Sequence, residues 1–265
     1  PDPWKAVTLR PTVKSGPNGP ALLWSHIDAK ALIEDTNLWK AFRKYCWFTK
    51  QYSLVAYVEW VYSTMVPTIT DHPIHSKLSF LSEGGGKTRI VAIGDYWSQE
   101  ALKGLHSMLH RALKSLKTDG TYNQGRLAKI VKSATLYGKP IYCFDLKSAT
   151  DRFPVSLQVN LLSQLIGAKA STAWKTLMSD RTFSTKNGSV VYATGTPMGL
   201  LTSWASFALC HHALIEYCGH LNNIKSFREY VVLGDDVAIF NTKVASTYET
   251  LINDLGVSIS KEKSL

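Results

Sequence analysis

Cysteine is scarce in this chain, and its spacing excludes two classes of site. The four cysteines contain no CxxC pair: Cys46, Cys143, Cys210 and Cys218. Structural zinc sites and disulfide frameworks depend on such clustering, so the sequence predicts neither. Acidic residues are also outnumbered, because 30 Lys and Arg face 20 Asp and Glu and leave a net charge of +10. This excess favours a polyanionic partner, with a solvated basic surface as the alternative.

The sequence also lacks repeats, a visible secretory or targeting leader, and a convincing membrane span. The stretch from Gly199 to Tyr217 comes closest to span length, but it carries several hydroxyl groups and two histidines. A bilayer core tolerates such groups poorly, so we expect a buried helix and no membrane span. The chain begins without Met and ends without a tail, which favours a segment of a longer protein.

What is present is a succession of helical and strand patterns. Helical spacing or composition occurs in six segments: 28–66, 97–116, 155–166, 169–178, 200–218 and 244–255. Strand or hairpin patterns occupy five others: 88–93, 140–145, 182–194, 230–240 and 257–260. The Asn187-Gly188 pair predicts a type I′ turn in the hairpin at 182–194. The mixture is typical of an α+β fold.

Acidic residues interrupt or end two of the predicted strands. Gly234-Asp235-Asp236 lies between two apolar runs, and Asp145 ends the strand at 140–145. Adjacent carboxylates with apolar flanks are costly unless a cation compensates their charge. Two such strand ends side by side supply the carboxylates of a two-metal site. Taken singly, each has an ordinary alternative: a surface turn, and a helix cap at Asp145.

A glycine-flanked loop leads into the helix at 200–218. It runs from Gly195 to Gly199 and is followed by Thr202 and Ser203. Glycines permit a close approach by another backbone, and the two hydroxyls can hydrogen-bond a ribose or a phosphate. A plain loop with a Ser/Thr helix cap is the alternative.

A second glycine-rich segment precedes the strand at 88–93. Lys87 and Arg89 are two residues apart on an extended chain, so they project to the same side. Together they can grip a triphosphate, Arg through its planar fork and Lys as a point charge. A P-loop is excluded, because Leu81 stands where that motif requires its first glycine before Gly86.

The order of these segments resembles motifs F, A, B, C and D of viral RNA-dependent RNA polymerases, and most closely those of the mitovirus family. The stretches 83–93, 95–99 and 256–265 also resemble that family, and the resemblance extends over residues 1–265. It implies a right-hand polymerase palm at 136–265, an antiparallel sheet with helices on one face. Largely helical fingers are implied at 1–135. Motif E and the thumb are expected to be absent.

The resemblance also implies the activity, RNA-templated RNA synthesis, and its partners. These are an RNA template and product and ribonucleoside triphosphates, with Mg²⁺ as cofactor and Mn²⁺ as an alternative. No obligate protein partner is indicated. A mitochondrial location is implied, either as a virus or as a copy integrated in a plant genome.

Individual roles follow from the same resemblance. Asp145 and Asp235 are the implied metal ligands, and Asp236 assists. The implied nucleotide-binding residues are Lys87 and Arg89 for the triphosphate, with Asp151, Ser203 and Thr202 for the ribose 2′-hydroxyl. Lys263 corresponds to the motif D lysine, a candidate proton donor to the leaving pyrophosphate. One departure is Phe207, where positive-strand virus polymerases commonly have Asn.

Two other functions remain open. A reverse transcriptase shares the palm, but Gly234 replaces the aromatic-x pair that precedes its aspartates, and Asp151 replaces a bulky steric gate. A non-catalytic RNA-binding remnant of an integrated polymerase is the second alternative.

Several histidines and basic residues could bind a metal ion or RNA, or could have only a structural role. A metal site at His106 and His110 is less favoured than a surface or core pair. The adjacent His211 and His212 should face different sides of their helix and share no ion. The cations of the helix at 97–116 and its end are candidates for an RNA channel or a solvated face: Lys103, Arg111, Lys114 and Lys117.

Overall fold

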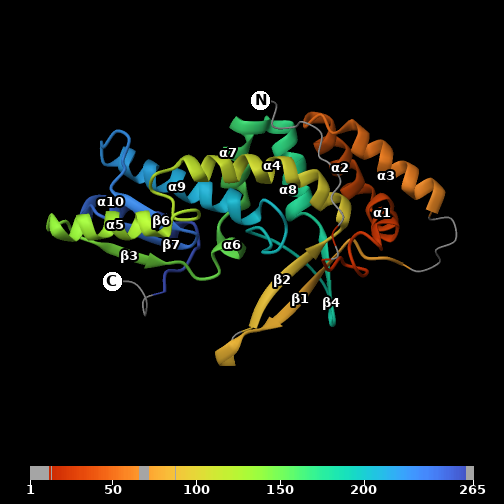
Figure 1. Ribbon diagram of the computed structural model, residues 1–265, viewed down its shortest axis with the longest axis horizontal. Helices are drawn as coiled ribbons and strands as arrows, with labels where there is room; N and C mark the ends of the chain where they lie inside the picture. Colours follow the sequence, from red (N-terminus) through yellow and green to blue (C-terminus); the bar gives the residue numbers. More distant parts are fainter. Residues whose placement is uncertain (1–11, 13, 66–71, 87, 261–265) are drawn as a thin grey trace. The chain divides into compact units, whose positions relative to one another are not determined.

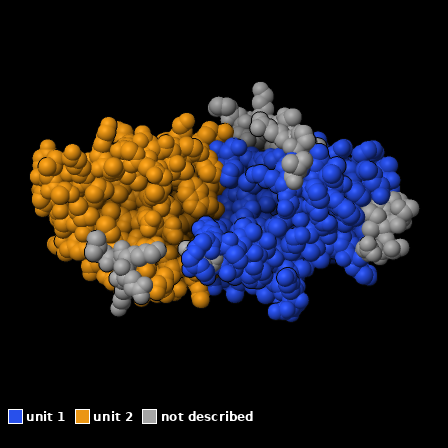
Figure 2. All heavy atoms as spheres, turned by 60° about the horizontal axis from the view of Figure 1, so that its bottom comes forward, with its two compact units in different colours: residues 1–107, 155–203 blue, residues 108–154, 204–265 orange. Residues whose placement is uncertain are grey.

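The computed structural model describes residues 12, 14–65, 72–86 and 88–260. The chain forms two compact units, each assembled from two separate stretches (Figure 2). Unit 1 comprises residues 1–107 and 155–203, and unit 2 comprises residues 108–154 and 204–265. The expected boundary at residue 136 separates the predicted fingers from the predicted palm and differs from the division into these two units. It stays a prediction.

Unit 1 contains a group of packed helices (Figure 1). They are α1 (Ser25–Glu34), α2 (Thr36–Phe48), α3 (Tyr52–Met65), α7 (Val155–Ile166) and α8 (Ala168–Met178). Asp35 caps α2, because its carboxylate accepts a hydrogen bond from the Leu38 amide at 2.9 Å. Leu38, Phe42 and Tyr45 recur at helical spacing and are fully or almost fully buried. The helical pattern predicted for 28–66 is therefore confirmed over the described residues.

The sheet of unit 1 has the strand order β2-β1-β4-β5. Its strands are β1 (Ser76–Ser82), β2 (Thr88–Gly94), β4 (Thr182–Thr185) and β5 (Gly188–Val191). β1 pairs antiparallel with β2 and parallel with β4. The strand at 88–93 was predicted, whereas β1 was not.

The β4–β5 hairpin forms, but its predicted turn is wrong by one residue. Thr185 pairs with Gly188, so the loop consists of Lys186 and Asn187. A type I′ turn needs positive φ at both loop residues. In this hairpin the positive φ, 130°, belongs to Gly188, the first residue after the loop. The glycine thus provides the positive φ at the first residue of β5, directly after the turn.

A polar hub joins the sheet and helices of unit 1. We use this name for Asp28, His75, Asp95, Ser98 and Arg181. Arg181 donates to Asp95 Oδ2 at 2.6 Å and to the His75 carbonyl at 2.7 Å. Both charged side chains are completely buried. Asp28 is also buried, and it accepts a hydrogen bond from the Tyr96 amide at 2.9 Å.

Unit 2 is built on a three-stranded antiparallel sheet with the order β3-β7-β6. Its strands are β3 (Tyr142–Asp145), β6 (Tyr230–Leu233) and β7 (Asp236–Ile239). Two short segments extend it through single bridges, Asp119 beside Val232 and Ile259 beside Leu146. The predicted strands at 140–145 and 230–240 are confirmed, and 257–260 is reduced to a bridge.

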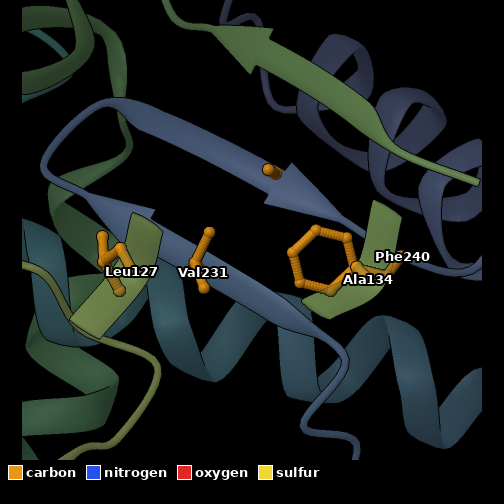
Figure 3. Close-up of a cluster of buried hydrophobic side chains, with 5 residues drawn as sticks. Leu127, Ala134, Val231 and Phe240 are labelled. Atoms are coloured by element: carbon orange, nitrogen blue, oxygen red, sulfur yellow. The ribbon is translucent and has the colours of Figure 1, made fainter. Parts of the chain in front are cut away.

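Helices cover both faces of this sheet. α5 (Gln124–Leu136) packs Leu127 and Ala134 against Val231 and Phe240 on one face (Figure 3). On the other face, α10 (Thr242–Asp254) places Tyr248 against Phe144, with ring centroids 5.2 Å apart. We expected an antiparallel sheet with helices on one face only. The structure adds α5 on the second face.

The remaining helices are α4 (Tyr96–Ser115), α6 (Ala149–Arg152) and α9 (Ser203–Leu221). α9 corresponds to the apolar stretch that approached membrane-spanning length in the sequence. Neither it nor another helix of the described chain is long and apolar enough to cross a membrane.

Candidate active site

The acidic residues of unit 2 meet across the β3–β7 ladder. Asp145, the last residue of β3, pairs with Asp236, the first residue of β7. Gly234 and Asp235 form the two-residue loop between β6 and β7, because Leu233 pairs with Asp236. Directly opposed residues have Cβ atoms about 4.5–5.5 Å apart. The register therefore brings two acidic residues together and places the third in the adjoining loop.

The loop that carries Asp235 depends on glycine. Gly234 has a φ of 66°, the left-handed conformation that a type II′ hairpin uses at its first loop position. A Cβ at Gly234 would lie 3.2 Å from Trp204 Nε1. Glycine thus permits both the bend and the close packing of the loop on the indole ring.

Asp145 and Asp236 line a groove on the sheet face that α5 covers. The groove has a volume of about 350 Å³, and apolar residues such as Val131 and Ala238 form most of its walls. Asp145 is half-buried, whereas Asp235 and Asp236 are exposed. Burial and the charge of Asp236 raise the pKa of Cys143, which also lines the groove. The groove therefore combines an apolar floor with negative charge at one end.

The opposed carboxylates fit a cation that other groups help to bind. Within the described ranges, no three or more His, Cys, Asp and Glu side chains form a cluster able to hold a metal ion. Like charges directly opposite each other destabilise a sheet, and a divalent cation reverses that effect. Mg²⁺ commonly uses one or two carboxylates and completes its shell with water and substrate phosphates. The arrangement matches such a site better than a complete protein cage.

The segment after α10 returns to the acidic residues. Ser260 N donates to the Asp145 carbonyl at 2.8 Å, and Lys147 N donates to the Ser258 carbonyl at 2.8 Å. Lys263, the predicted proton donor, lies outside the described residues. Its role stays a prediction.

Asp151 lies on α6, in the same unit as Asp145. It is exposed, and its amide donates to the Ser148 carbonyl at 3.0 Å. Ser148 has a φ of 50°, so the chain between the two acidic residues makes a left-handed bend. Such conformations are uncommon for residues other than glycine and gather at functional sites.

The predicted loop of unit 1, from Gly195 to Gly199, is joined to the sheet. Ala92 N donates to the Met198 carbonyl at 2.7 Å, and Ser179 Oγ donates to the Gly195 carbonyl at 2.9 Å. Gly199 has a φ of 111°, and a Cβ there would lie 2.3 Å from the Ala92 carbonyl oxygen. The close backbone approach predicted for this loop is therefore made by Gly199, to β2 of the same unit.

The two hydroxyl residues after this loop are buried. Thr202 Oγ1 accepts a hydrogen bond from Trp174 Nε1 at 2.8 Å. Ser203 Oγ lies 3.0 Å from Thr196 Oγ1. Thr202 also has a φ of 77°, a strained value for a β-branched residue. These contacts hold the start of α9, and direct ribose contacts by either hydroxyl stay predictions.

Of the two predicted triphosphate ligands, Arg89 lies near one end of the β1–β2 hairpin. Arg89 on β2 forms an exposed ion pair with Glu83, with 2.8 Å between Arg89 Nε and Glu83 Oε1. A second contact joins the Arg89 guanidinium to Glu83 Oε2 at 3.2 Å. Lys87 lies outside the described residues. The Glu83 carboxylate therefore already occupies the Arg89 guanidinium.

The adjacent histidines of α9 face different partners, as predicted. His211 contacts Gly234 and Tyr248, and His212 contacts Asp119 and Tyr230. The sequence signal was a pair of polar residues inside an apolar helix, but the partners of that pair were not predicted.

The other histidine and basic candidates have separate surroundings. His106 Nδ1 accepts a hydrogen bond from the Thr202 amide at 3.3 Å. His110 stacks on Trp204 with ring centroids 5.8 Å apart. Lys103 is paired with Glu100. The remaining predicted channel cations are exposed: Arg111, Lys114 and Lys117.

The family of the chain follows from its whole length. The model of the mitovirus RNA-dependent RNA polymerase family matches residues 3–265. The chain belongs to this family. The resemblance inferred from the ordered motifs is thus confirmed, and the motifs extend over both units.

Relatives of this mitovirus polymerase family member are viral and mitochondrial. The RNA-directed RNA polymerase of Cryphonectria parasitica mitovirus 1 is 34% identical over 96% of this chain and 33% of its own length. Two uncharacterized mitochondrial proteins of Arabidopsis thaliana are 35% and 34% identical over 57% and 58% of this chain. The matches cover 77% and 64% of those two proteins. The chain spans about a third of the viral relative's length.

A solved structure shares the fold at low identity. It is a telomerase from Candida albicans in complex with a fragment of telomeric RNA, with a TM-score of 0.51 and 13% identity. The match covers 72% of this chain and 41% of the telomerase chain. At this identity the match supports the polymerase-like fold alone.

Phe207, the departure noted above, is 1% exposed and packs against Phe153.

Proposed function

We propose that this chain carries the catalytic residues of an RNA-dependent RNA polymerase that uses a two-metal mechanism. One observation carries the proposal: the sheet register opposes Asp145 and Asp236 and places Asp235 in the adjoining loop. Membership of the mitovirus polymerase family supplies the reaction class. The substrates are an RNA template and ribonucleoside triphosphates.

Asp145 and Asp235 are the proposed direct metal ligands, and Asp236 assists them. Mg²⁺ is the preferred ion, with Mn²⁺ as the alternative, because all the candidate ligands are carboxylate oxygens. The metal ions that these carboxylates would hold would supply positive charge to the attacking and leaving oxygens of the transfer. The carboxylates supply the charge that holds these ions, and the groove beside Asp145 and Asp236 supplies a partly apolar space for substrate.

Other residues bind and discriminate the nucleotide. Arg89, together with Lys87, binds the triphosphate after exchange of the Glu83 carboxylate for phosphate. Asp151 recognises the ribose 2′-hydroxyl, which its exposure on α6 allows. Ser203 and Thr202 hold the loop that precedes α9, and Lys263 protonates the leaving pyrophosphate. The net charge of +10 supports RNA binding. The mitochondrion is the proposed location, in line with the relatives from Arabidopsis mitochondria.

The test is primer extension on an RNA template with the full-length protein. Asp145→Asn and Asp235→Asn keep the side-chain shape but remove charge, so incorporation should fall by at least roughly a hundredfold. RNA affinity should persist, since the basic surface is unchanged. Glu229→Gln is the matched control, because Glu229 precedes β6 at the strand end away from the acidic loop and pairs there with Lys139 at 2.6 Å. Near-normal incorporation by Asp235→Asn would contradict the metal assignment.

The same assay separates the two alternatives. A non-catalytic remnant binds RNA but extends no primer even before mutation. A reverse transcriptase prefers deoxynucleotides. For the proposed enzyme, Asp151→Ala should weaken the preference for ribonucleotides more than it slows incorporation, because a site that hydrogen-bonds a hydroxyl rejects analogues lacking it. Equal discrimination in mutant and parent would remove Asp151 from this role.

A further inference from the structure

His211 connects two helices of unit 2 to the acidic loop. Its Nδ1 lies 3.1 Å from the carbonyl oxygen of Gly234, the residue before Asp235. Its Nε2 lies 2.7 Å from the Tyr248 hydroxyl on α10. His211 and Tyr248 are both fully buried. The imidazole is therefore a buried bridge between the catalytic-site loop and the helix that packs beneath the sheet.

The hydrogen bonds define the tautomer of this histidine. A carbonyl oxygen only accepts, so Nδ1 carries the proton that Gly234 receives. Burial is the main cause that lowers the pKa of His211 to about 4, so the ring is neutral near pH 7. Nε2 then accepts from the hydroxyl of Tyr248, whose pKa burial raises well above its usual value. Each polar atom of the bridge has one defined role.

A column of aromatic rings fixes the orientation of the imidazole. His211 stacks on Phe207 at 5.5 Å and on Tyr248 at 5.7 Å, both with interplanar angles of 28°. Tyr248 contacts Phe144, the residue before Asp145. Phe207 contacts Phe153, two residues after Asp151. The column thus adjoins the segments that carry the proposed metal ligands and the proposed ribose-binding residue Asp151.

We infer that His211 is a positioning residue for the acidic loop: its Nδ1–H holds the Gly234 carbonyl and thereby sets where Asp235 presents its carboxylate. The inference rests on the proposed function, because it assigns a purpose to the geometry of the proposed metal ligands. Groups that orient metal ligands typically change metal affinity or activity by about tenfold to a hundredfold when they are mutated. Phe207 takes part by supplying one face of the stack, at the position where related polymerases commonly have a polar residue.

The adjacent His212 offers an internal control. It is 2% exposed, and its ring nitrogens lie 3.0 Å from Asp119 Oδ2 and 3.0 Å from the Tyr230 hydroxyl. Burial opposes ionisation of Asp119, but hydrogen bonds from His212 and Thr121 lower its pKa. These contacts hold the segment at 118–120 beside β6. His212 is thus a buried histidine of the same helix that supports the sheet without contacting the acidic loop.

Two substitutions at His211 separate its two hydrogen bonds. In His211→Asn, the amide nitrogen occupies nearly the place of Nδ1 and can still donate to Gly234. In His211→Gln, the amide lies nearer the place of Nε2, so the bond to Tyr248 is favoured and the bond to the loop is lost. Tyr248→Phe keeps the ring stack and removes only the hydroxyl. His212→Gln is the matched control.

The loop itself is measured first, in metal-free full-length protein. Hydrogen exchange of the amides at 230–240 should accelerate about tenfold in His211→Gln and change by less than about threefold in His211→Asn and His212→Gln. The second readout is the affinity for Mn²⁺, measured by electron paramagnetic resonance at the site that Asp235→Asn is expected to abolish. In His211→Gln this affinity should fall about tenfold. The kcat should fall similarly, and KM for the nucleotide should be unchanged. Tyr248→Phe should show a smaller effect of the same kind.

Equal effects of His211→Gln and His212→Gln on loop exchange and Mn²⁺ affinity would overturn the inference, since both histidines would then be merely structural. Normal loop exchange in His211→Gln would overturn it as well. If His211→Gln does not fold, Tyr248→Phe decides, and unchanged exchange, Mn²⁺ affinity and kcat in that variant would count against the inference. Failure of the proposed function is recognised separately, as normal incorporation by Asp235→Asn, and leaves the exchange result interpretable.

Discussion

The polar hub of unit 1 and the acidic loop of unit 2 place carboxylates in opposite circumstances. In the hub, Asp95 is completely buried against the Arg181 guanidinium, 2.6 Å away. In unit 2, Asp145 is opposed by a second acidic residue, Asp236, and the loop beside them adds Asp235. The hub thus pairs a buried carboxylate with a buried cation, whereas unit 2 gathers three acidic residues at two strand ends and a loop.

The difference separates a carboxylate that the protein itself compensates from the carboxylates that we propose to bind metal. A buried carboxylate needs a cation or several hydrogen bonds from the protein, because desolvation is otherwise too costly. Carboxylates directly opposite each other repel, and the proposed metal ions would bring the positive charge that offsets this repulsion. Mutations should therefore affect stability in the hub and activity in the loop.

The largest effect is expected when the hub loses its cation. Arg181→Met leaves Asp95 buried without its countercharge, so the free energy of unfolding should fall by about 3–5 kcal/mol. Urea unfolding monitored by circular dichroism measures the change. Arg228→Met is the control, because Arg228 is 55% exposed and pairs with Glu216 at 2.7 Å. An exposed pair of this kind contributes about 0–1 kcal/mol. Equal losses in both variants would remove the distinction.

In the acidic loop the expected change is in activity. Asp145→Asn should reduce incorporation by at least roughly a hundredfold, which corresponds to about 2.7 kcal/mol of activation free energy. Because the substitution relieves repulsion with Asp236, metal-free stability should remain the same or rise. Unfolding and primer extension are measured on the same preparation. A loss of stability as large as that of Arg181→Met would make Asp145 a structural residue.

Asp28 should make the hub sensitive to pH. Burial, reinforced by the charge of Asp95, raises the pKa of Asp28 from 3.8 to about 7. A raised carboxyl pKa means that folding takes up a proton, so this contribution to stability is present at low pH and is lost as pH rises towards and through 7. Between pH 6 and pH 8 the loss should be roughly 1 kcal/mol. Asp28→Asn, which keeps an acceptor for the Tyr96 amide, should flatten the dependence. A stability that rises over this range in the parent, or an unchanged slope in the variant, would refute the assignment.

The smallest effect is expected at the exposed pair of unit 1. Glu83→Gln should change stability by less than about 1 kcal/mol, because both side chains of the Arg89–Glu83 pair are more than 40% exposed. It should also lower KM for the nucleotide by a few-fold, since phosphate no longer competes with the carboxylate for Arg89. Arg89→Gln should raise that KM. Equal KM values in all three proteins would separate Arg89 from nucleotide binding.

Long periodic segments could be predicted, whereas short or mixed ones could not. α7 has the bounds 155–166 that the sequence predicted. α5 was not predicted, although Leu127, Ile130, Val131 and Ala134 have helical spacing, because polar residues surround them and no pattern marks the sheet that they cover. β1 was missed for a similar reason. Its burial decreases along the strand, so apolar and polar residues do not alternate regularly between two faces.

The sequence by itself determined the family, the acidic residues and the order of those elements that have long periodic patterns. These are local properties, because a strand pattern that ends in Asp145 and a glycine before paired aspartates are both visible in a few consecutive residues. Tertiary structure alone decided that Asp236 faces Asp145. It also decided that His211 reaches Gly234 and Tyr248, which are 23 and 37 residues away in the chain. Strand register and buried hydrogen bonds are set by packing between distant segments, and no local pattern encodes that packing.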